Sequence, residues 1–137
     1  MPDAMSRQLE GRAALVTGSG RGIGQGIAAV LASRGASVAV SDLNEAACAE
    51  TVALIRSNGG RAVAIAADVT SQASMDAAVS RVIAEFGRLD IAVANAGVIG
   101  AKGYEDRAGY TEDDWDVTFA VNVKGLAHTV DAVTPHM

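Results

Sequence analysis

The sequence predicts an α/β fold in which a parallel β-sheet carries helices on both faces. Short, uncharged apolar runs alternate along the chain with segments whose apolar residues recur at helical spacing. Within the runs, apolar residues do not alternate with polar ones, which is typical of strands buried on both faces of a parallel sheet. Strands that alternate with helices imply right-handed crossovers. A chain of 137 residues suits one domain, since domains commonly have ~100–200 residues, and we expect residues 1–137 to form a single one.

Four apolar runs are the candidate strands. Each is short and ends at residues that favour a turn: Ala13–Val16, Val38–Val40, Ala62–Ala67 and Ile91–Ala94. The irregular stretch Val98–Tyr110, with its glycines and mixed charges, is expected to form a surface loop.

Three helices are predicted between these strands. The first is indicated by apolar residues that stop before a possible cap at Gly35, namely Ile23, Ile27, Val30 and Leu31. Asn44 can cap a second helix that ends near Ser57. Thr70 or Ser71 can cap the third. Its apolar face consists of Met75, Ala78, Val79, Val82, Ile83 and Phe86.

A fourth helix is predicted after the loop. Thr111 and Asp114 have the spacing of a capping box, with Asp114 where Glu or Gln is usual. The helix that follows is apolar nearly all round, with Trp115, Phe119, Leu126, Val130 and Val133 accompanied by Val117, Val121 and Val123 on other sides. Such a pattern predicts burial on more than one face.

Composition excludes several classes of function. The net charge is -5 and the 11 basic residues are scattered, so a nucleic-acid partner is disfavoured. The single cysteine, Cys48, excludes an internal disulfide, and neither His128 nor His136 has ligands at metal-binding spacing. The polar segment Met1–Arg12 is unlike a secretory signal, and Ile91–Ala101 is too short to span a membrane. We therefore expect a cytoplasmic protein without a metal site or membrane partner.

A glycine-rich segment follows the first predicted strand directly. It reads Thr17-Gly18-Ser19-Gly20-Arg21-Gly22-Ile23-Gly24 and leads into the first predicted helix. Glycines at such a turn let backbone N–H groups approach a pyrophosphate, and the positive end of the helix favours the anion. The segment predicts a dinucleotide site, because it lies between a strand and a helix. The alternative is a tight turn without a ligand.

Asp42, at the end of the second predicted strand, bears on the choice of dinucleotide. A carboxylate there can accept hydrogen bonds from the adenosine ribose and repels a 2′-phosphate. Neither Leu43 nor Asn44 supplies a positive charge that would attract such a phosphate. The sequence therefore favours NAD over NADP. The alternative is that Asp42 only begins the turn into the next helix.

Together these residues resemble the classical short-chain dehydrogenase/reductase family. Beyond the glycine segment, the resemblance rests on Asp68-Val69, on Leu89–Gly97 with its Asn95-Ala96-Gly97, and on Trp115 with Asn122–Gly125. It implies a Rossmann-like doubly wound parallel sheet and hydride transfer between NAD(H) and a secondary alcohol or ketone. It also implies that the cofactor meets Gly18, Ser19, Gly20, Arg21, Gly22, Ile23, Gly24, Asp42, Leu43, Asp68, Val69, Asn95, Ala96 and Gly97. Asn122 would be a catalytic residue that supports a proton relay, and the protein would form a homo-oligomer.

The sequence departs from the family pattern in two places. Ala94 stands where the family has the first Asn of Asn-Asn-Ala-Gly, and no Ser or Tyr-x-x-x-Lys follows the last helix. In the family, that Tyr is the general acid/base. We therefore expect a sheet truncated after the fourth strand and the long helix, a C-terminally incomplete domain, and a chain that is inactive and marginally stable alone. The alternative function is a non-catalytic nucleotide-binding or interaction module that acts through a partner.

Overall fold

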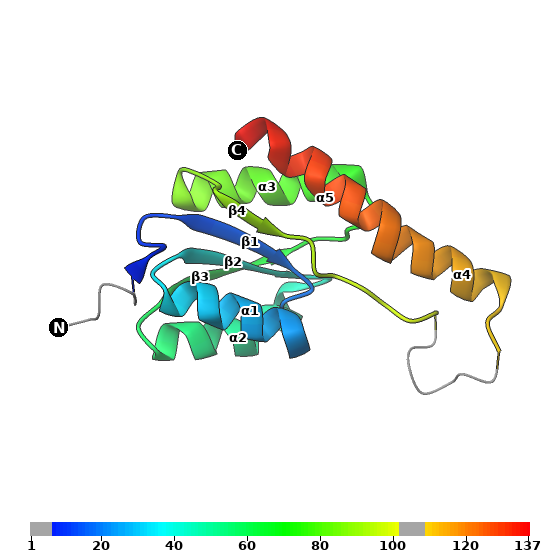
Figure 1. The fold of residues 1–137 in the computed structure, drawn as a ribbon, viewed down its shortest axis with the longest axis horizontal. Helices are drawn as coiled ribbons and strands as arrows, with labels where there is room; N and C mark the ends of the chain where they lie inside the picture. Colours follow the sequence, from blue (N-terminus) through cyan, green and yellow to red (C-terminus); the bar gives the residue numbers. More distant parts are fainter. Residues whose placement is uncertain (1–6, 102–108) are drawn as a thin grey trace.

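The computed structural model describes residues 7–101 and 109–137 as a four-stranded parallel sheet with helices on both faces. The strand order is β3-β2-β1-β4, with β1 at Ala13–Thr17, β2 at Ser37–Asp42, β3 at Arg61–Ala66 and β4 at Ile91–Val93. Helix α1 (Gly22–Ser33), α2 (Glu45–Ser57) and α3 (Gln72–Phe86) form the crossovers (Figure 1). The predicted doubly wound parallel fold is confirmed.

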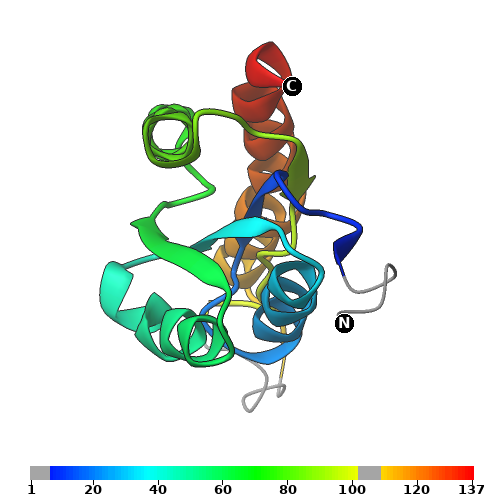
Figure 2. The same cartoon turned by 90° about the vertical axis from the view of Figure 1, so that its left-hand side faces the viewer.

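Two hydrophobic clusters lie on opposite faces of the sheet because side chains along a strand alternate between its faces. In β1, Leu15 packs with α3 on one face, whereas Ala14 and Val16 pack with α1 and α2 on the other. Figure 2 shows α3 and the long C-terminal helical segment on one side of the sheet, with α1 and α2 on the other. All five residues of β1 are buried, so this strand is the centre of the fold.

The helix boundaries follow the local signals in the sequence. The Asn44 side chain accepts a hydrogen bond from the Ala47 N–H at 2.8 Å, and Ser71 caps α3 by accepting one from the Ser74 N–H at 3.2 Å. Gly87 ends α3 in the left-handed conformation, with φ of 77°. Helices α2 and α3 therefore begin where a side chain satisfies the backbone, and α3 ends at a glycine.

Helix α1 buries its small residues more completely than its large ones. Gly24, Ala28 and Ala32 face the sheet, whereas Ile23 is 80% exposed. Small side chains bring the helix close to the strands. Of the four apolar residues that identified the helix, Ile27 and Leu31 are partly buried against the core, whereas Ile23 and Val30 are exposed.

The C-terminal helical segment runs from Glu112 to His136. It consists of α4 (Glu112–Phe119), the π-helical turn η2 (Ala120–Lys124), α5 (Gly125–Val133) and the 3₁₀ turn η3 (Thr134–His136). The predicted capping box is confirmed: Thr111 Oγ1 accepts from the Asp114 N–H at 3.2 Å, and Asp114 Oδ2 accepts from the Thr111 N–H at 2.9 Å.

The prediction that this helix is buried on more than one face is wrong. No residue of α4 or η2 is buried, and Phe119 remains 53% exposed. Figure 1 shows α4 extending beyond the carboxyl ends of the strands, whereas α5 lies alongside α3. The segment therefore covers the core mainly through α5, with Ala132 and Val133 buried, while Val121 of η2 is only partly buried against it.

The loop predicted at Val98–Tyr110 is only partly within the described structure. Residues 98–101 and 109–110 contain no helix or strand, and residues 102–108 lie outside the described residues. Among residues 7–101 and 109–137, no helix is both long and apolar enough to cross a lipid bilayer.

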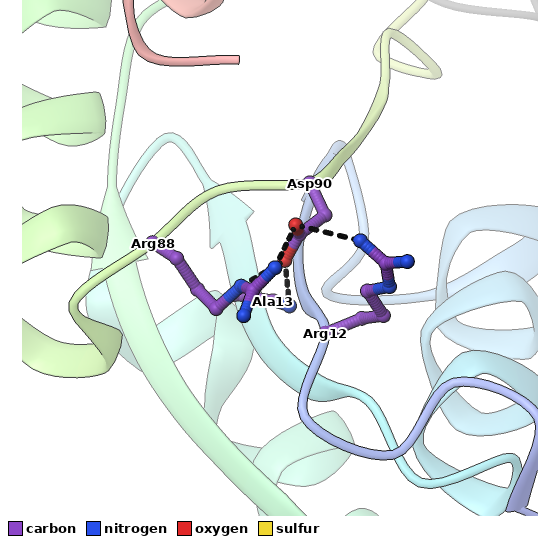
Figure 3. A network of polar contacts seen from close by, with 4 residues as sticks. All are labelled: Arg12, Ala13, Arg88 and Asp90. Atoms are coloured by element: carbon purple, nitrogen blue, oxygen red, sulfur yellow. Dashed lines mark hydrogen bonds and ion pairs between the residues drawn. The ribbon is translucent and has the colours of Figure 1, made fainter.

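A polar network holds β4 against β1 at the amino-terminal ends of the strands (Figure 3). Asp90 Oδ2 accepts a hydrogen bond from the Ala13 N–H at 2.9 Å. Arg88 binds the same carboxylate through two nitrogens at 2.8 and 2.7 Å, and Arg12 lies 3.2 Å from Oδ1. Hydrogen bonds from Arg88, then from Ala13, hold the pKa of Asp90 well below its usual range.

Candidate cofactor-binding site

A cavity of about 400 Å³ lies at the carboxyl-terminal edge of the sheet. This is the edge at which open parallel α/β sheets bind their ligands. Twelve of the predicted cofactor-binding residues line it: Gly18, Arg21, Gly22, Ile23, Gly24, Asp42, Leu43, Asp68, Val69, Asn95, Ala96 and Gly97. Residues predicted from four separate stretches of sequence are thus brought to one cavity.

Ser19 and Gly20 lie behind the surface of the cavity. Ser19 is fully buried, and its hydroxyl donates to the Val16 carbonyl at 2.6 Å and accepts from the Ser41 N–H at 3.0 Å. These bonds attach the glycine turn to the ends of β1 and β2. In this structure the two residues hold the turn in place and do not line the cavity.

Two glycines leave no room for a larger side chain. Gly18 has φ of 62°, and a Cβ there would lie 2.8 Å from the Ala96 Cα. A Cβ on Gly20 would collide with the Ala47 carbonyl oxygen and lie 2.8 Å from Asp42 Oδ2. The turn therefore approaches both the residues after β4 and the start of α2 at distances that only glycine allows.

The Asp42 carboxylate is fixed by two backbone N–H groups. Its Oδ2 accepts from Gly20 at 3.1 Å, and its Oδ1 accepts from Leu43 at 2.9 Å. A carboxylate oxygen can accept more than one hydrogen bond. The half-buried side chain therefore lines the cavity in a set orientation and keeps capacity for a ligand's hydroxyl groups.

Asp68 and Val69 are held by contacts with the neighbouring Thr70 and with the C-terminal helical segment. Asp68 Oδ1 accepts from the Thr70 N–H at 2.9 Å and from the Thr70 hydroxyl at 2.7 Å. The Val69 carbonyl lies 2.8 Å from His128 Nδ1, which donates to it from α5. The C-terminal helical segment therefore contributes to the position of this part of the cavity wall.

The turn after β4 is bonded directly to the end of β1. The Thr17 hydroxyl accepts from the N–H groups of Asn95 and Ala96 at 3.0 and 3.1 Å. The Asn95 side chain donates to the carbonyls of Thr17 and Gly18 at 3.1 and 3.2 Å. Two segments almost 80 positions apart in sequence thus form one continuous wall.

Five further residues that were not among the predicted cofactor-binding residues also line the cavity: Thr17, Ser41, Ala67, Val98 and Val121. The first three stand at or just beyond strand ends, so the predicted carboxyl edge of the sheet was a signal that could have found them. Val98 and Val121 come from the loop and from η2. Only the tertiary structure brings these two to the cavity.

Asn122, the predicted catalytic residue, does not line the cavity. It is exposed, and its side-chain amide forms two hydrogen bonds with the backbone of Val98: Oδ1 accepts at 2.8 Å and Nδ2 donates at 2.9 Å. It lies in the π-helical turn, a feature that often occurs at functional sites. The observed contacts join the long helix to the chain that follows β4.

This arrangement, with a glycine turn between β1 and α1 and an aspartate at the end of β2, is that of a Rossmann-like fold. A family model described as short chain dehydrogenase matches residues 12–137. The chain belongs to the short-chain dehydrogenase family.

Several known proteins are similar to this chain. Elsinochrome reductase 1 of Elsinoe fawcettii is 45% identical over 119 residues, which are 86% of this chain and 43% of that protein. Cyclohexanol dehydrogenase of Rhodococcus sp. (strain TK6) is 43% identical, over 94% of this chain and 53% of its own length. A short chain dehydrogenase/reductase from Burkholderia phymatum, solved in complex with NAD, has a TM-score of 0.83 and 32% identity, over 95% of this chain and 45% of that one. The chain thus spans about half the length of the relatives it matches.

Proposed function

We propose that this chain forms the NAD(H)-binding part of an oxidoreductase that transfers hydride between NAD(H) and a secondary alcohol or ketone. The observation that carries the proposal is the Asp42 carboxylate, which lines the cavity and is fixed by Gly20 and Leu43 beside the glycine turn. The family membership and the NAD complex of a structural neighbour support the same class of cofactor. Residues 1–137 would form one domain, since both hydrophobic clusters share a single sheet.

The residues of the cavity fit a dinucleotide. The pyrophosphate would lie at the start of α1, where Gly18 and Gly22 add no side-chain bulk and the first turn contains no acidic residue. The unpaired N–H groups of that turn and the helix dipole both favour an anion. Arg21, at the cap of α1, adds a positive charge at the same place.

The adenosine half would lie between the ends of β2 and β3. Asp42 would accept the ribose hydroxyls, with Leu43 against the adenine, and it would repel a 2′-phosphate. Asp68 and Val69 would meet the other side of the adenine, where the resemblance to the family places the Asp side chain near the amino group.

The nicotinamide half would extend toward the residues that follow β4. Asn95, Ala96 and Gly97 line this part of the cavity. The bound cofactor supplies the hydride chemistry, and the chain supplies position and electrostatics. Asn122 would act indirectly by supporting a proton relay, as the resemblance to the family implies, with its side-chain amide held by Val98.

Proton transfer to the substrate oxygen needs a positioned acid of suitable pKa. Among the described residues, Tyr110 is exposed and the centroid of its ring lies 5.1 Å from that of Trp115 with the ring planes tilted by 44°, while Tyr104 lies outside the described residues. We therefore propose that the chain of 137 residues does not turn over an alcohol by itself. Reduction of NAD by this purified chain in the presence of secondary alcohols would contradict that proposal.

We also propose that the protein assembles as a homo-oligomer. An exposed apolar stripe supports this, with members at helical spacing on one face of the C-terminal helical segment: Trp115, Phe119, Val123, Leu126 and Val130. An exposed apolar surface of this kind commonly marks an interface.

A fluorescence titration with NADH, with NADPH in parallel, tests the cofactor proposal. We expect saturable NADH binding at least about tenfold tighter than NADPH binding, since hydrogen bonds to a charged group contribute ~1.5–3 kcal/mol. Asp42→Ala should weaken NADH binding by about tenfold or more and remove most of the preference. Glu45→Gln is the matched control, because it removes a nearby carboxylate that pairs with Arg81 outside the cavity. Equal affinities for both cofactors in the unmodified protein, or unchanged NADH binding by Asp42→Ala, would contradict the proposal.

A further inference from the structure

Thr51, in the middle of α2, bonds to the glycine turn and not to its own helix. Its hydroxyl oxygen lies 2.9 Å from the Ser19 carbonyl oxygen and 3.1 Å from that of Gly20. Gln25, in α1, donates to the same hydroxyl at 3.0 Å. Thr51 is fully buried, so these three contacts replace water. The Thr51 hydroxyl thus connects α1 and α2 to the glycine turn through hydrogen bonds that an apolar side chain could not form.

The hydrogen-bond roles at this hydroxyl are fixed by its neighbours. An amide nitrogen can only donate, so the Gln25 side chain occupies an acceptor position on Thr51 Oγ1. The carbonyls of Ser19 and Gly20 can only accept, so the hydroxyl proton is directed toward them. Gln25 thereby helps to hold the Thr51 hydroxyl in the orientation that binds the turn.

Holding two carbonyls also sets the directions of two N–H groups. In a trans peptide the C=O and the following N–H point in opposite directions. The Ser19 carbonyl points toward Thr51, and the next N–H, that of Gly20, accordingly reaches Asp42 Oδ2 at 3.1 Å. The Gly20 carbonyl also points toward Thr51, which turns the Arg21 N–H away from α2, and Arg21 lines the cavity.

We propose that Thr51 is a positioning residue for cofactor binding, with Gln25 as its support. It holds the peptide units on both sides of Gly20 so that one N–H fixes Asp42 and the next faces the pyrophosphate position. This inference rests on the proposed function, because it assigns Thr51 a part in NAD(H) binding. Thr51 itself touches no cofactor and acts through the backbone of the turn.

Thr51→Val tests the role, since valine keeps the shape and removes the hydroxyl. We expect the dissociation constant for NADH to rise about fivefold to tenfold, the equivalent of about one hydrogen bond. We also expect faster amide hydrogen exchange at Gly20, Arg21 and Gly22 in the protein without cofactor. Thr51→Ser keeps the hydroxyl and should restore NADH binding to within about twofold of the unmodified protein. The binding and exchange measurements are made on the whole protein and not on an isolated part of it.

Ile55→Val is the control for a merely structural effect. Ile55 is buried in the same helix, and loss of one methyl there should reduce stability without changing NADH binding or exchange in the turn. Gln25→Met is a second test of the same hydroxyl, because it removes the hydrogen bond that Gln25 donates to Thr51. It should weaken NADH binding about twofold to threefold and also speed exchange in the turn, even if Thr51→Val fails to fold.

The outcomes separate this inference from the proposed function. Failure of the unmodified protein to bind NADH would overturn the proposed function, and the exchange measurements would still decide whether Thr51 holds the turn. Unchanged NADH affinity and unchanged exchange in Thr51→Val, or in Gln25→Met if Thr51→Val does not fold, would overturn the positioning role. Equal losses in Thr51→Ser and Thr51→Val would overturn it as well.

Discussion

Two regions of the molecule differ in how far they bury their apolar side chains. One is the sheet together with α1, α2 and α3, and the other is the C-terminal helical segment. In β1, Leu15 is fully buried between two strands and the helices of one face. In the C-terminal helical segment, Leu126 is 50% exposed, as are the apolar residues Val123 and Val130 on the same face, at 55% and 48%. The difference follows from the position of each element, since β1 lies between β2 and β4 inside the sheet whereas α4 extends beyond the carboxyl ends of the strands (Figure 1). An apolar pattern therefore indicates a helix, but the surrounding elements determine whether it is buried.

The largest expected effect is on the free energy of unfolding, and it tests this comparison with the same substitution at one leucine of each region. Leu15→Ala should lower the free energy of unfolding by about 3 kcal/mol, because it removes fully buried methyl groups and leaves a cavity. Leu126→Ala should lower it by less than about 1 kcal/mol, since half of that side chain already contacts water. Urea unfolding at a protein concentration that keeps the chain monomeric measures both. Similar losses for the two variants would mean that the C-terminal helical segment is packed as tightly as the sheet.

The second prediction concerns the exposed stripe in the proposed homo-oligomer. Phe119→Glu and Leu126→Glu would each place a carboxylate in the apolar contact, and we expect each to weaken self-association by at least about tenfold. Sedimentation velocity over a range of concentrations measures the association. Glu112→Gln, on an exposed side chain at the start of α4 and outside the stripe, is the control and should leave it unchanged. A monomer at all concentrations, in the unmodified protein, would contradict the oligomer proposal.

The sequence predicted those features that depend on neighbouring residues. Asn44 and Ser71 cap their helices as expected because the capping bond reaches only three positions along the chain. The glycine turn and Asp42 reach the same cavity because both lie at the carboxyl ends of parallel strands, which are at one edge of the sheet. Local spacing and one rule of topology were sufficient for these features.

Features that depend on distant contacts could not be predicted. The bond between Thr51 and the glycine turn joins residues about thirty positions apart, and no local pattern distinguishes this threonine from one bonded to its own helix. The exposure of Ile23 has a related cause, because packing on the sheet determines which face of α1 is buried, and that face carries Gly24, Ala28 and Ala32. The burial wrongly expected for the C-terminal helical segment rested on its apolar residues alone.

The smallest expected effect lies at the opposite edge of the sheet from the cavity. There Asp90 binds β1 to β4 through the Ala13 N–H, and the exposed guanidinium groups of Arg88 and Arg12 share its carboxylate. We expect Asp90→Asn to lower the free energy of unfolding by about 1 kcal/mol at pH 7, because much of the ion pairing is screened by solvent. Urea unfolding at several pH values measures the difference.

The pH dependence of this difference has a definite sign. The pKa of Asp90 lies below its usual range in the folded chain, so the carboxylate stabilises the fold fully above the unfolded pKa of about 3.9. Below that pH the unfolded chain takes up a proton first, and the advantage over Asp90→Asn should shrink as the pH falls toward the folded pKa. Glu10→Gln is the control. Its pair with Arg7 is exposed on both sides, and its loss should cost less than about 0.5 kcal/mol. If the difference in unfolding free energy between the unmodified protein and Asp90→Asn stayed constant from pH 7 to pH 3, the contact would act by shape and not by charge.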